Sequence, residues 1–218
     1  MSRESTERLR VLLNKATDED LYTLMEYNYG ENCPSVGVDD LIRKIRYNGS
    51  HNLAYLFRKL DGVEYLEIVQ DVARKLKVEY TDNENEQNIE AKIMVKFLRD
   101  FMKNTKEEEK REFQEYLKQQ GVQELDDHAI LKYILGNPAA LEGVVKLFAA
   151  IANKIAMQLL RREIKAAAYP LMGEIAVLGG LLILFAGPAY KKTTPSVIHI
   201  AFLRQKIKLQ DFKDGDDL

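Results

Sequence analysis

The sequence has one cysteine among its 218 residues, Cys33, together with five prolines and no tryptophan. A single cysteine excludes an internal disulfide and any cysteine-rich metal site. The opening segment MSRESTERLR lacks the basic region and the following apolar stretch of a secretory signal, so we expect no such signal. These absences favour a protein of the reducing cytoplasm.

Motifs for catalysis and for cofactor binding are also missing. The three histidines are scattered along the chain, at His51, His128 and His199, and no HExxH zinc motif occurs. Gly179-Gly180 lies within apolar residues and is not followed by the Lys-Ser/Thr of a phosphate-binding loop. Cys33 precedes a proline and has no activating neighbour in the sequence. We therefore expect a protein that is not an enzyme and that binds no cofactor.

Two acidic clusters could be considered as metal sites, but helix starts explain them better. The three glutamates after Thr105 occupy the first turn of a predicted helix, where the helix dipole favours negative charge. Glu124 and His128 could share a helix face beside Asp126 and Asp127, yet no second ligand pair accompanies them. We expect both clusters to lie at solvent-exposed helix N-termini.

Charge is distributed unevenly along a chain whose formal net charge is -2. Residues 137–210 carry ten Lys and Arg residues against three Asp and Glu residues, so the apolar half of the chain is also the basic half. This pairing fits an anionic lipid surface or an acidic partner. Nucleic acid is a poor fit, because the basic residues are not interleaved with aromatic residues and the chain has 34 acids.

The most apolar segment is residues 171–190, LMGEIAVLGGLLILFAGPAY, in which Glu174 is the only charged residue. Its uninterrupted core of twelve residues, from Ile175 to Ala186, is shorter than the roughly 20 residues of a membrane span. That length favours a buried helix. Insertion stays open as an alternative, because Glu174 lies near one end, where a charge costs little.

Helical periodicity recurs along the chain, and no period-two alternation indicates a sheet. The sequence therefore predicts an all-α, multi-helix globular bundle with a central apolar helical hairpin over residues 139–190. Ser5 or Thr6 can cap a first helix, and Thr17 with Asp20 forms a capping box. Further helices are expected from Asp39 to Asn48-Gly49, at residues 50–60, 63–77, 89–102, 105–117 and 125–135, and from Thr194-Pro195 onward.

Three units are expected along the chain. Residues 1–80 form a small helical N-terminal module, which ends at the polar segment EYTDNENEQN. Residues 81–210 form a helical body that includes the apolar hairpin, and residues 211–218 form a disordered acidic tail.

Three segments give the chain a family resemblance: DGVEYLEIVQDVARKLKV at residues 61–78, EAKIMVKFLRDFMKNTKEEEKREFQEYL at residues 90–117, and AYKKTTPSVIHIAFLRQK at residues 189–206. They resemble the YaaW-like bacterial proteins, a family of unknown function with a short helical module ahead of its body. The resemblance implies a loose link to ubiquinol-cytochrome c chaperones, helical proteins that assist assembly of a membrane respiratory complex. It supplies no catalytic residues.

Two functional hypotheses follow from these observations. The first is a non-enzymatic interaction or chaperone-like protein with an unidentified protein partner, peripheral to the inner face of a membrane. The second is a latent membrane-active effector that releases the hairpin on a trigger. Either would use the basic and apolar residues of the hairpin and its ends, namely Arg161, Arg162, Lys165, Leu178, Leu182, Phe185, Lys191 and Lys192. Neither the partner nor the oligomeric state can be read from the sequence.

Overall fold

A computed structural model describes residues 2–30, 32–50, 63–104 and 190–216, together with single helical positions at 111, 115 and 118. Within these ranges every regular element is a helix, which confirms the predicted all-α class for the described residues. The elements are α1 Ser2–Leu13, α2 Asp18–Tyr29, α3 Val38–Ser50, α4 Tyr65–Leu76, α5 Glu86–Asn104 and α10 Tyr190–Asp216.

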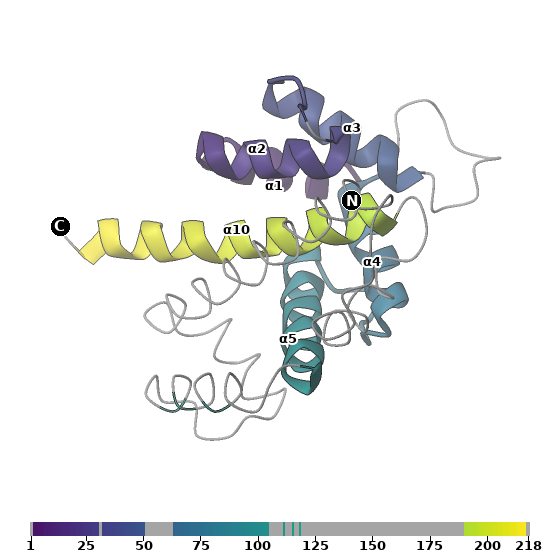
Figure 1. The fold of residues 1–218 in the computed structure, drawn as a ribbon, viewed down its shortest axis with the longest axis vertical. Coiled ribbons are helices and arrows are strands. Elements are labelled where there is room, and N and C mark those ends of the chain that lie inside the picture. The colour runs from purple at the N-terminus through teal and green to yellow at the C-terminus, as the bar shows by residue number, and fades with distance from the viewer. Residues whose placement is uncertain are drawn as a thin grey trace, which may run out of the picture.

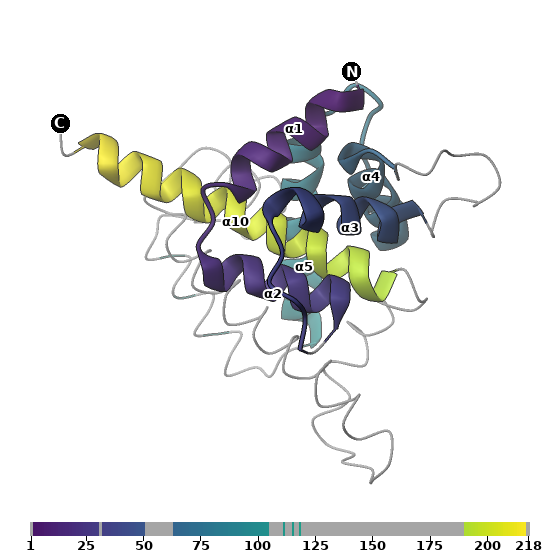
Figure 2. The same ribbon diagram turned by 90° about the horizontal axis from the view of Figure 1, so that it is seen from above.

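The C-terminal helix α10 runs through the middle of the described structure. Helices α1, α2 and α3 lie on one side of it, and α4 and α5 lie on the other (Figure 1). Seen from above, α2 runs alongside α10, and α1 and α3 lie on its other side in this view (Figure 2). Helix α10 contacts each of the other five described helices. A segment near the C-terminus therefore holds together helices from the N-terminal half of the chain.

The core forms around this central helix. Thirteen consecutive residues, 193–205, are buried, so α10 is covered on every side along this length. Apolar residues from all six helices meet here, among them Leu9, Leu13, Leu24, Leu41, Ile45, Ile68, Val72, Ile93, Phe97, Val197, Ala201 and Leu203. A helix buried all round is usually apolar all round. The buried part of α10 nevertheless includes five polar or charged residues after Thr193, namely Thr194, Ser196, His199, Arg204 and Gln205.

Ser5 and Thr6 cap a different helix from the one predicted. Helix α1 already begins at Ser2, so both residues lie inside it. The Ser5 hydroxyl accepts the N–H of Leu66 at 3.2 Å, and the Thr6 hydroxyl donates to Glu64 at 2.6 Å. Glu64 is the N-cap of α4 and makes no side-chain capping bond. Helix α1 therefore supplies the cap of α4 across the helix interface.

The predicted cap at the start of α2 is confirmed. Thr17 is the N-cap residue, and its hydroxyl oxygen accepts the N–H of Asp20 at 3.3 Å. At the other end, Gly30 has a φ of 95°, a backbone conformation that glycine adopts without steric cost. The described residues from Gly30 to Gly37 form the loop between α2 and α3.

The end of α3 differs from the prediction at Asn48-Gly49. The helix continues to Ser50, and Gly49 lies inside it. A Cβ atom on Gly49 would lie 2.6 Å from Cγ1 of Ile68, so α4 approaches the α3 backbone closely at this point. The glycine serves helix packing here rather than helix termination.

The start of α10 is a second correction. Thr194 and Pro195 were predicted as cap and first turn, but α10 begins four residues earlier, at Tyr190, with Pro195 inside it. Proline inside a helix removes one backbone hydrogen bond and costs about 3 kcal/mol. Burial of the surrounding residues offsets this cost, since the residues from Thr193 to Val197 are all buried.

The other end of α10 reaches into the segment expected to be disordered. The helix continues to Asp216, and Leu209 is still buried. Lys15, beyond the end of α1, forms an ion pair with Asp211 at 2.8 Å, which ties this part of the helix to the N-terminal segment.

Several predicted elements lie outside the described residues. These are residues 51–60 of the helix expected at 50–60, the helices expected at 105–117 and 125–135 apart from the three single positions, and the hairpin over residues 139–190 up to its last residue. The hairpin therefore stays a prediction. Among the helices that the structure describes, none combines the length and the apolar character needed to cross a bilayer. The proposed division at residue 80 also stays a prediction.

Candidate functional site

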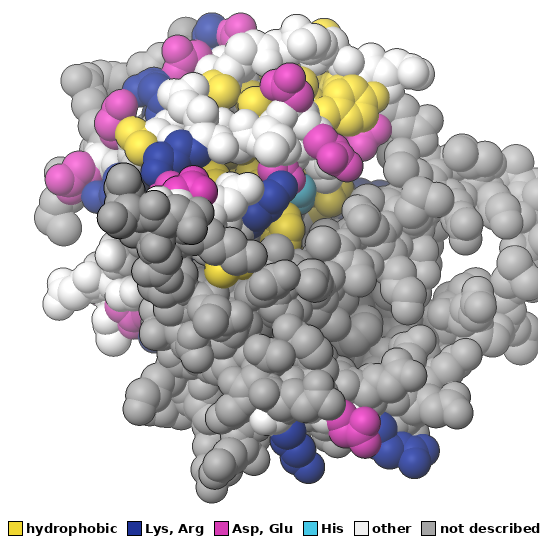
Figure 3. Space-filling model, turned by 90° about the vertical axis from the view of Figure 1, so that its left-hand side faces the viewer, with side chains coloured by type: hydrophobic (Ala, Val, Ile, Leu, Met, Phe, Trp, Pro, Cys, Tyr) yellow, Lys and Arg dark blue, Asp and Glu magenta, His cyan; other side chains and the backbone are white. Residues whose placement is uncertain are grey.

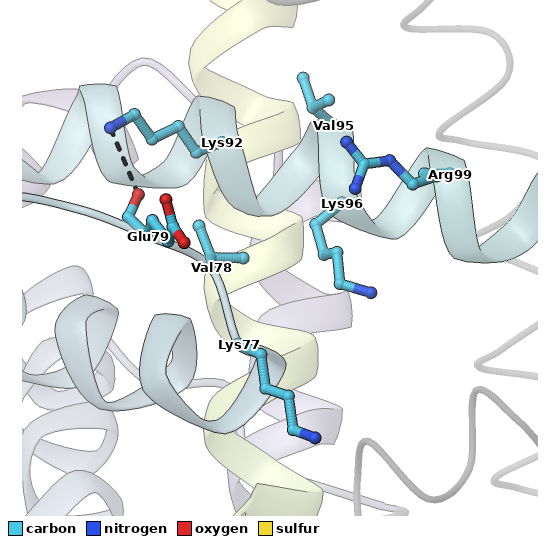
Figure 4. Close-up of a pocket in the computed structure, with 7 residues that line it drawn as sticks. All are labelled: Lys77, Val78, Glu79, Lys92, Val95, Lys96 and Arg99. Atoms are coloured by element: carbon cyan, nitrogen blue, oxygen red, sulfur yellow. Dashed lines mark hydrogen bonds between the residues drawn. The ribbon is translucent and has the colours of Figure 1, made fainter. Parts of the chain in front are cut away.

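A basic pocket lies beside α5, where the chain leaves α4. Its volume is about 490 Å³, and its described lining residues are Lys77, Val78, Glu79, Lys92, Val95, Lys96 and Arg99. Lys92, Lys96 and Arg99 are spaced four and three residues apart, which places them on one face of the helix. Figure 4 shows Lys77 and Lys96 extending toward the same side of α5. The described lining is thus cationic, with Glu79 as its one acid.

Two of the lysines have carboxylate partners. Lys92 forms an ion pair with Glu84 at 2.7 Å, and its ammonium also donates to the carbonyl of Glu79 at 3.3 Å. Burial by itself would raise the pKa of Glu84, but hydrogen bonds from Lys92 and Thr81 hold that pKa below its usual value. Lys96 pairs with Asp100 at 2.5 Å. These bonds fix the two lysine side chains at the wall of the pocket.

Lys77 has an unusual backbone. It is the C-cap of α4 and has φ 56° and ψ 42°, in the left-handed region. Helices most often place glycine in such a conformation, because a Cβ atom there carries a steric cost of about 1 kcal/mol. The conformation directs the chain from α4 along the pocket through Val78 and Glu79. Lysine therefore occupies a position where the backbone conformation alone would favour glycine, which has no side chain.

A second polar site, buried and closed, joins α4, α5 and α10. Arg204 donates to both oxygens of Glu90, at 2.7 and 3.2 Å, and the Tyr65 hydroxyl donates to the same carboxylate at 2.8 Å. All three residues are at most 5% exposed. Burial alone would lower the pKa of Arg204, but the Glu90 carboxylate raises it above its ordinary value. Burial and Glu90 together raise the pKa of Tyr65.

One helical turn earlier on α5, Glu86 anchors α1. Arg8 donates to the two Glu86 oxygens at 2.6 and 2.7 Å, in a fork that matches the geometry of a carboxylate. Burial would raise the pKa of Glu86, but the Arg8 guanidinium holds it below its usual value. Helix α5 thus carries two buried carboxylates, each held by an arginine from a different helix.

A hydrogen-bond network centred on Asn28 joins α2 and α3 to the first turns of α10. The Asn28 amide donates to the Ser196 hydroxyl at 2.9 Å and to the carbonyl of Leu24 at 2.8 Å. The Asn48 amide donates to the Asn28 side-chain oxygen at 2.9 Å, and Lys192 donates to the Asn28 carbonyl at 3.2 Å. These bonds fix the part of α10 that directly follows the apolar stretch.

His199 lies at the interface of α2 and α10, without a hydrogen-bond partner for either ring nitrogen among the described residues. Its ring packs edge-on against Tyr27 and also against Phe202, with both centroids 5.9 Å away. Asp20, paired with Lys206 at 2.7 Å, is the nearby carboxylate. Burial lowers the pKa of His199 to about 4, against the opposing effect of Asp20. This imidazole is neutral near neutral pH.

The outer surface of the described part carries charges of both signs. On the face in Figure 3, Lys and Arg side chains are interspersed with Asp and Glu side chains, and hydrophobic side chains lie among them. Ion pairs such as Arg10 with Asp39, at 2.7 Å, join exposed residues on α1 and α3.

Comparison with known proteins gives distant relatives. A UPF0174 protein of Helicobacter pylori is 28% identical over 216 residues, covering 88% of this chain and 99% of that protein. Two UPF0174 proteins of a second strain are 28% and 26% identical, again over 88% of this chain. These matches show distant homology to UPF0174 proteins, whose name states no activity. No family model and no solved structure matches the chain.

Most residues predicted for partner or membrane contact lie outside the described part. These are Arg161, Arg162, Lys165, Leu178, Leu182 and Phe185. Lys191 and Lys192 are described, and both lie in the first turn of α10. Lys191 is exposed, whereas Lys192 is half-buried against Asn28. Within this pair, Lys191 is therefore the side chain available at the surface.

Sequence reasoning missed both the basic pocket and the buried ion pairs. The spacing of Lys92, Lys96 and Arg99 on a predicted helix was a readable signal for a basic helix face.

Cys33 is half-buried in the loop after α2, where burial raises the pKa of its thiol. Over the described ranges no group of three potential ligands is placed to hold a metal ion.

Proposed function

We propose that this protein is a non-enzymatic interaction protein of chaperone-like type, peripheral to the inner face of a membrane. In this proposal the described helices form a fixed platform, and the apolar segment 171–190 is the part that engages a partner or a lipid surface. We further propose that the YaaW-like resemblance and the homology to UPF0174 proteins refer to one group of proteins. Both span most of the chain.

The observation that carries this proposal is the anchoring of α10. This helix begins at Tyr190, where the apolar stretch ends, and is buried over residues 193–205. Its first turns are held by Asn28 and Ser196, and the Lys75 ammonium lies 4.9 Å from the centroid of the Tyr190 ring. Because α10 is firmly held, the apolar segment that precedes it is anchored at its C-terminal end. Such anchoring suits a segment that is presented to a partner or a lipid surface.

Chemistry in the described core also supports an interaction role. The buried groups Arg204 and Glu90 neutralise each other in a closed pair, and the buried Glu86 is paired with the half-buried Arg8. The neutral imidazole of His199 has a pKa of about 4, too low for efficient general base catalysis near neutral pH. Their arrangement is that of structural ion pairs, which fix the relative positions of helices.

Flotation with vesicles tests the membrane part of this proposal. The purified protein is mixed with phosphatidylcholine vesicles and with equimolar phosphatidylcholine and phosphatidylglycerol vesicles, then centrifuged through a density gradient. We expect retention on the anionic vesicles that fades with added salt, and loss of retention in a folded Leu182→Arg variant. To test the charge alone, Lys191→Gln is preferable to a Lys192 variant, because Lys192 also donates a hydrogen bond to the Asn28 carbonyl. No retention of the wild type on either vesicle contradicts membrane contact.

His199 supports the second candidate function, a latent membrane-active effector whose hairpin over residues 139–190 is released by acid. Protonation of a buried imidazole that lacks a hydrogen-bond partner weakens the packing of α2 on α10. Leakage of a trapped dye from anionic vesicles at pH 5 and pH 7 separates the two functions. The effector requires leakage at pH 5 that is reduced in His199→Leu, and absence of leakage at both pH values contradicts it.

A further inference from the structure

We propose that the basic pocket beside α5 binds a phosphate-type anion. Its cations come from two separate parts of the chain: Lys77 from the end of α4, and Lys92, Lys96 and Arg99 from α5. This inference concerns residues 77–99 and does not depend on the proposed function, which concerns the apolar segment.

Charge and donor type indicate the class of ligand. Among the described residues, four basic side chains line the pocket with Glu79 as the one acidic residue, and Lys92 and Lys96 are paired with Glu84 and Asp100. The planar guanidinium of Arg99 and the ammonium groups of Lys77 and Lys96 are the donors that proteins use for phosphate groups. A volume of about 490 Å³ has room for a group larger than a single phosphate, such as a diphosphate.

Lys92 and Lys96 are held by the carboxylates of Glu84 and Asp100, whereas Lys77 has an exposed side chain. Lys92 is held by Glu84 and by the Glu79 carbonyl, so it forms part of the wall. Lys77 is exposed, and its ammonium extends toward the same side of α5 as that of Lys96 (Figure 4). The proposed diphosphate lies between Lys77 and Lys96, while the Arg99 guanidinium turns back along α5 beside Val95 (Figure 4).

The backbone of Lys77 is the second, independent observation. In its left-handed conformation glycine is preferred, so the lysine is held at a steric cost where its ammonium lines the pocket. This gives an unusually clean variant. Lys77→Gly removes the positive charge and relieves the backbone at the same time, so loss of binding without a lower melting temperature reports on the charge.

The test uses the full chain with inorganic pyrophosphate in isothermal titration calorimetry at low ionic strength. We expect saturable binding by the wild type, and binding about tenfold weaker in Lys77→Gly and in Arg99→Gln, as for loss of one charge-assisted hydrogen bond. Arg43→Gln is the matched control, because Arg43 is an exposed cation on α3, which contributes no lining residue. Thermal melting checks that each variant is folded, and we expect Lys77→Gly to melt no lower than the wild type.

A second arm distinguishes a soluble phosphate from a lipid headgroup. The protein is floated with equimolar phosphatidylcholine and phosphatidic acid vesicles, with and without pyrophosphate. Retention that pyrophosphate displaces, and that Lys77→Gly weakens, identifies a lipid headgroup as the source, whereas pyrophosphate binding without retention identifies a soluble one. Leu182→Arg changes the apolar segment and none of the described lining residues, so its loss of retention with intact pyrophosphate binding reports on the proposed function alone. The inference is overturned if the wild type gives no saturable titration, or if Lys77→Gly and Arg99→Gln bind as tightly as Arg43→Gln.

Discussion

His199 makes the stability of the fold depend on pH at the scale of a single residue. Its pKa in the folded state is about 4, below the ordinary value of 6.5, so the folded state disfavours the proton. The contribution of the neutral imidazole is complete above pH 6.5 and decreases as the pH falls toward 4. At pH 5 the loss amounts to about 2 kcal/mol, from about 1.4 kcal/mol per pH unit below 6.5. Urea unfolding of the wild type at pH 7 and pH 5 measures it.

The matched variant is His199→Leu, which keeps an apolar side chain between Tyr27 and Phe202 but cannot take up a proton. The other ionisable groups are present in both proteins, so the difference between the two pH dependences isolates His199. Parallel pH dependences for wild type and variant would contradict the assignment.

The buried pair of Arg204 and Glu90 predicts strong energetic coupling. Replacing Glu90 by Gln leaves Arg204 as an unpaired buried charge and should lower the free energy of unfolding by about 3–5 kcal/mol. Gln keeps an oxygen that can accept the Tyr65 hydroxyl, so the loss reports on the charge. Arg204→Met should cost a similar amount. The double variant should cost clearly less than the two together, as chemical denaturation can show, and additive losses would contradict the pairing.

At the scale of an element, the approach of α3 to α4 depends on Gly49. A Cβ atom there would lie 2.6 Å from Cγ1 and 2.8 Å from Cδ1 of Ile68. Gly49→Ala should therefore destabilise the protein by about 1–3 kcal/mol, although alanine is the better helix former. Ile68→Val removes the Cδ1 methyl group and should recover part of that loss. The melting temperatures of the single and double variants test this, and a Gly49→Ala variant more stable than the wild type would contradict the packing.

Helix starts that depend on neighbouring residues were predictable, and contacts between distant segments were not. Thr17 and Asp20 form a local signal, and α2 begins as they indicate. Pro195 is also a local signal, yet α10 begins before it, because tertiary burial outweighs the cost of an internal proline. Glu90 and Arg204 are 114 residues apart, so nothing near either residue indicates the pair. Lys77 has a left-handed backbone because α4 ends there, and a lysine in the sequence does not indicate such a conformation.

For the whole molecule, the central position of α10 predicts that the N-terminal helices need the C-terminal one. Ser196, His199 and Lys206 of α10 contact Asn28, Tyr27 and Asp20 of α2, and Glu86 of α5 holds Arg8 of α1. A fragment of residues 1–80 lacks both partner helices, so the apolar faces of α1, α2 and α3 lose much of their cover.

We therefore expect this fragment to show weak helicity and no cooperative thermal transition by circular dichroism, whereas the full chain melts cooperatively. Adding a peptide of residues 190–216 should raise the helicity of the fragment above the sum of the two spectra, because the peptide restores the central helix. A Lys206→Glu peptide is the control, since it places a second acid opposite Asp20. A cooperative transition of the fragment alone would instead establish residues 1–80 as an independent folding module, as the sequence predicts.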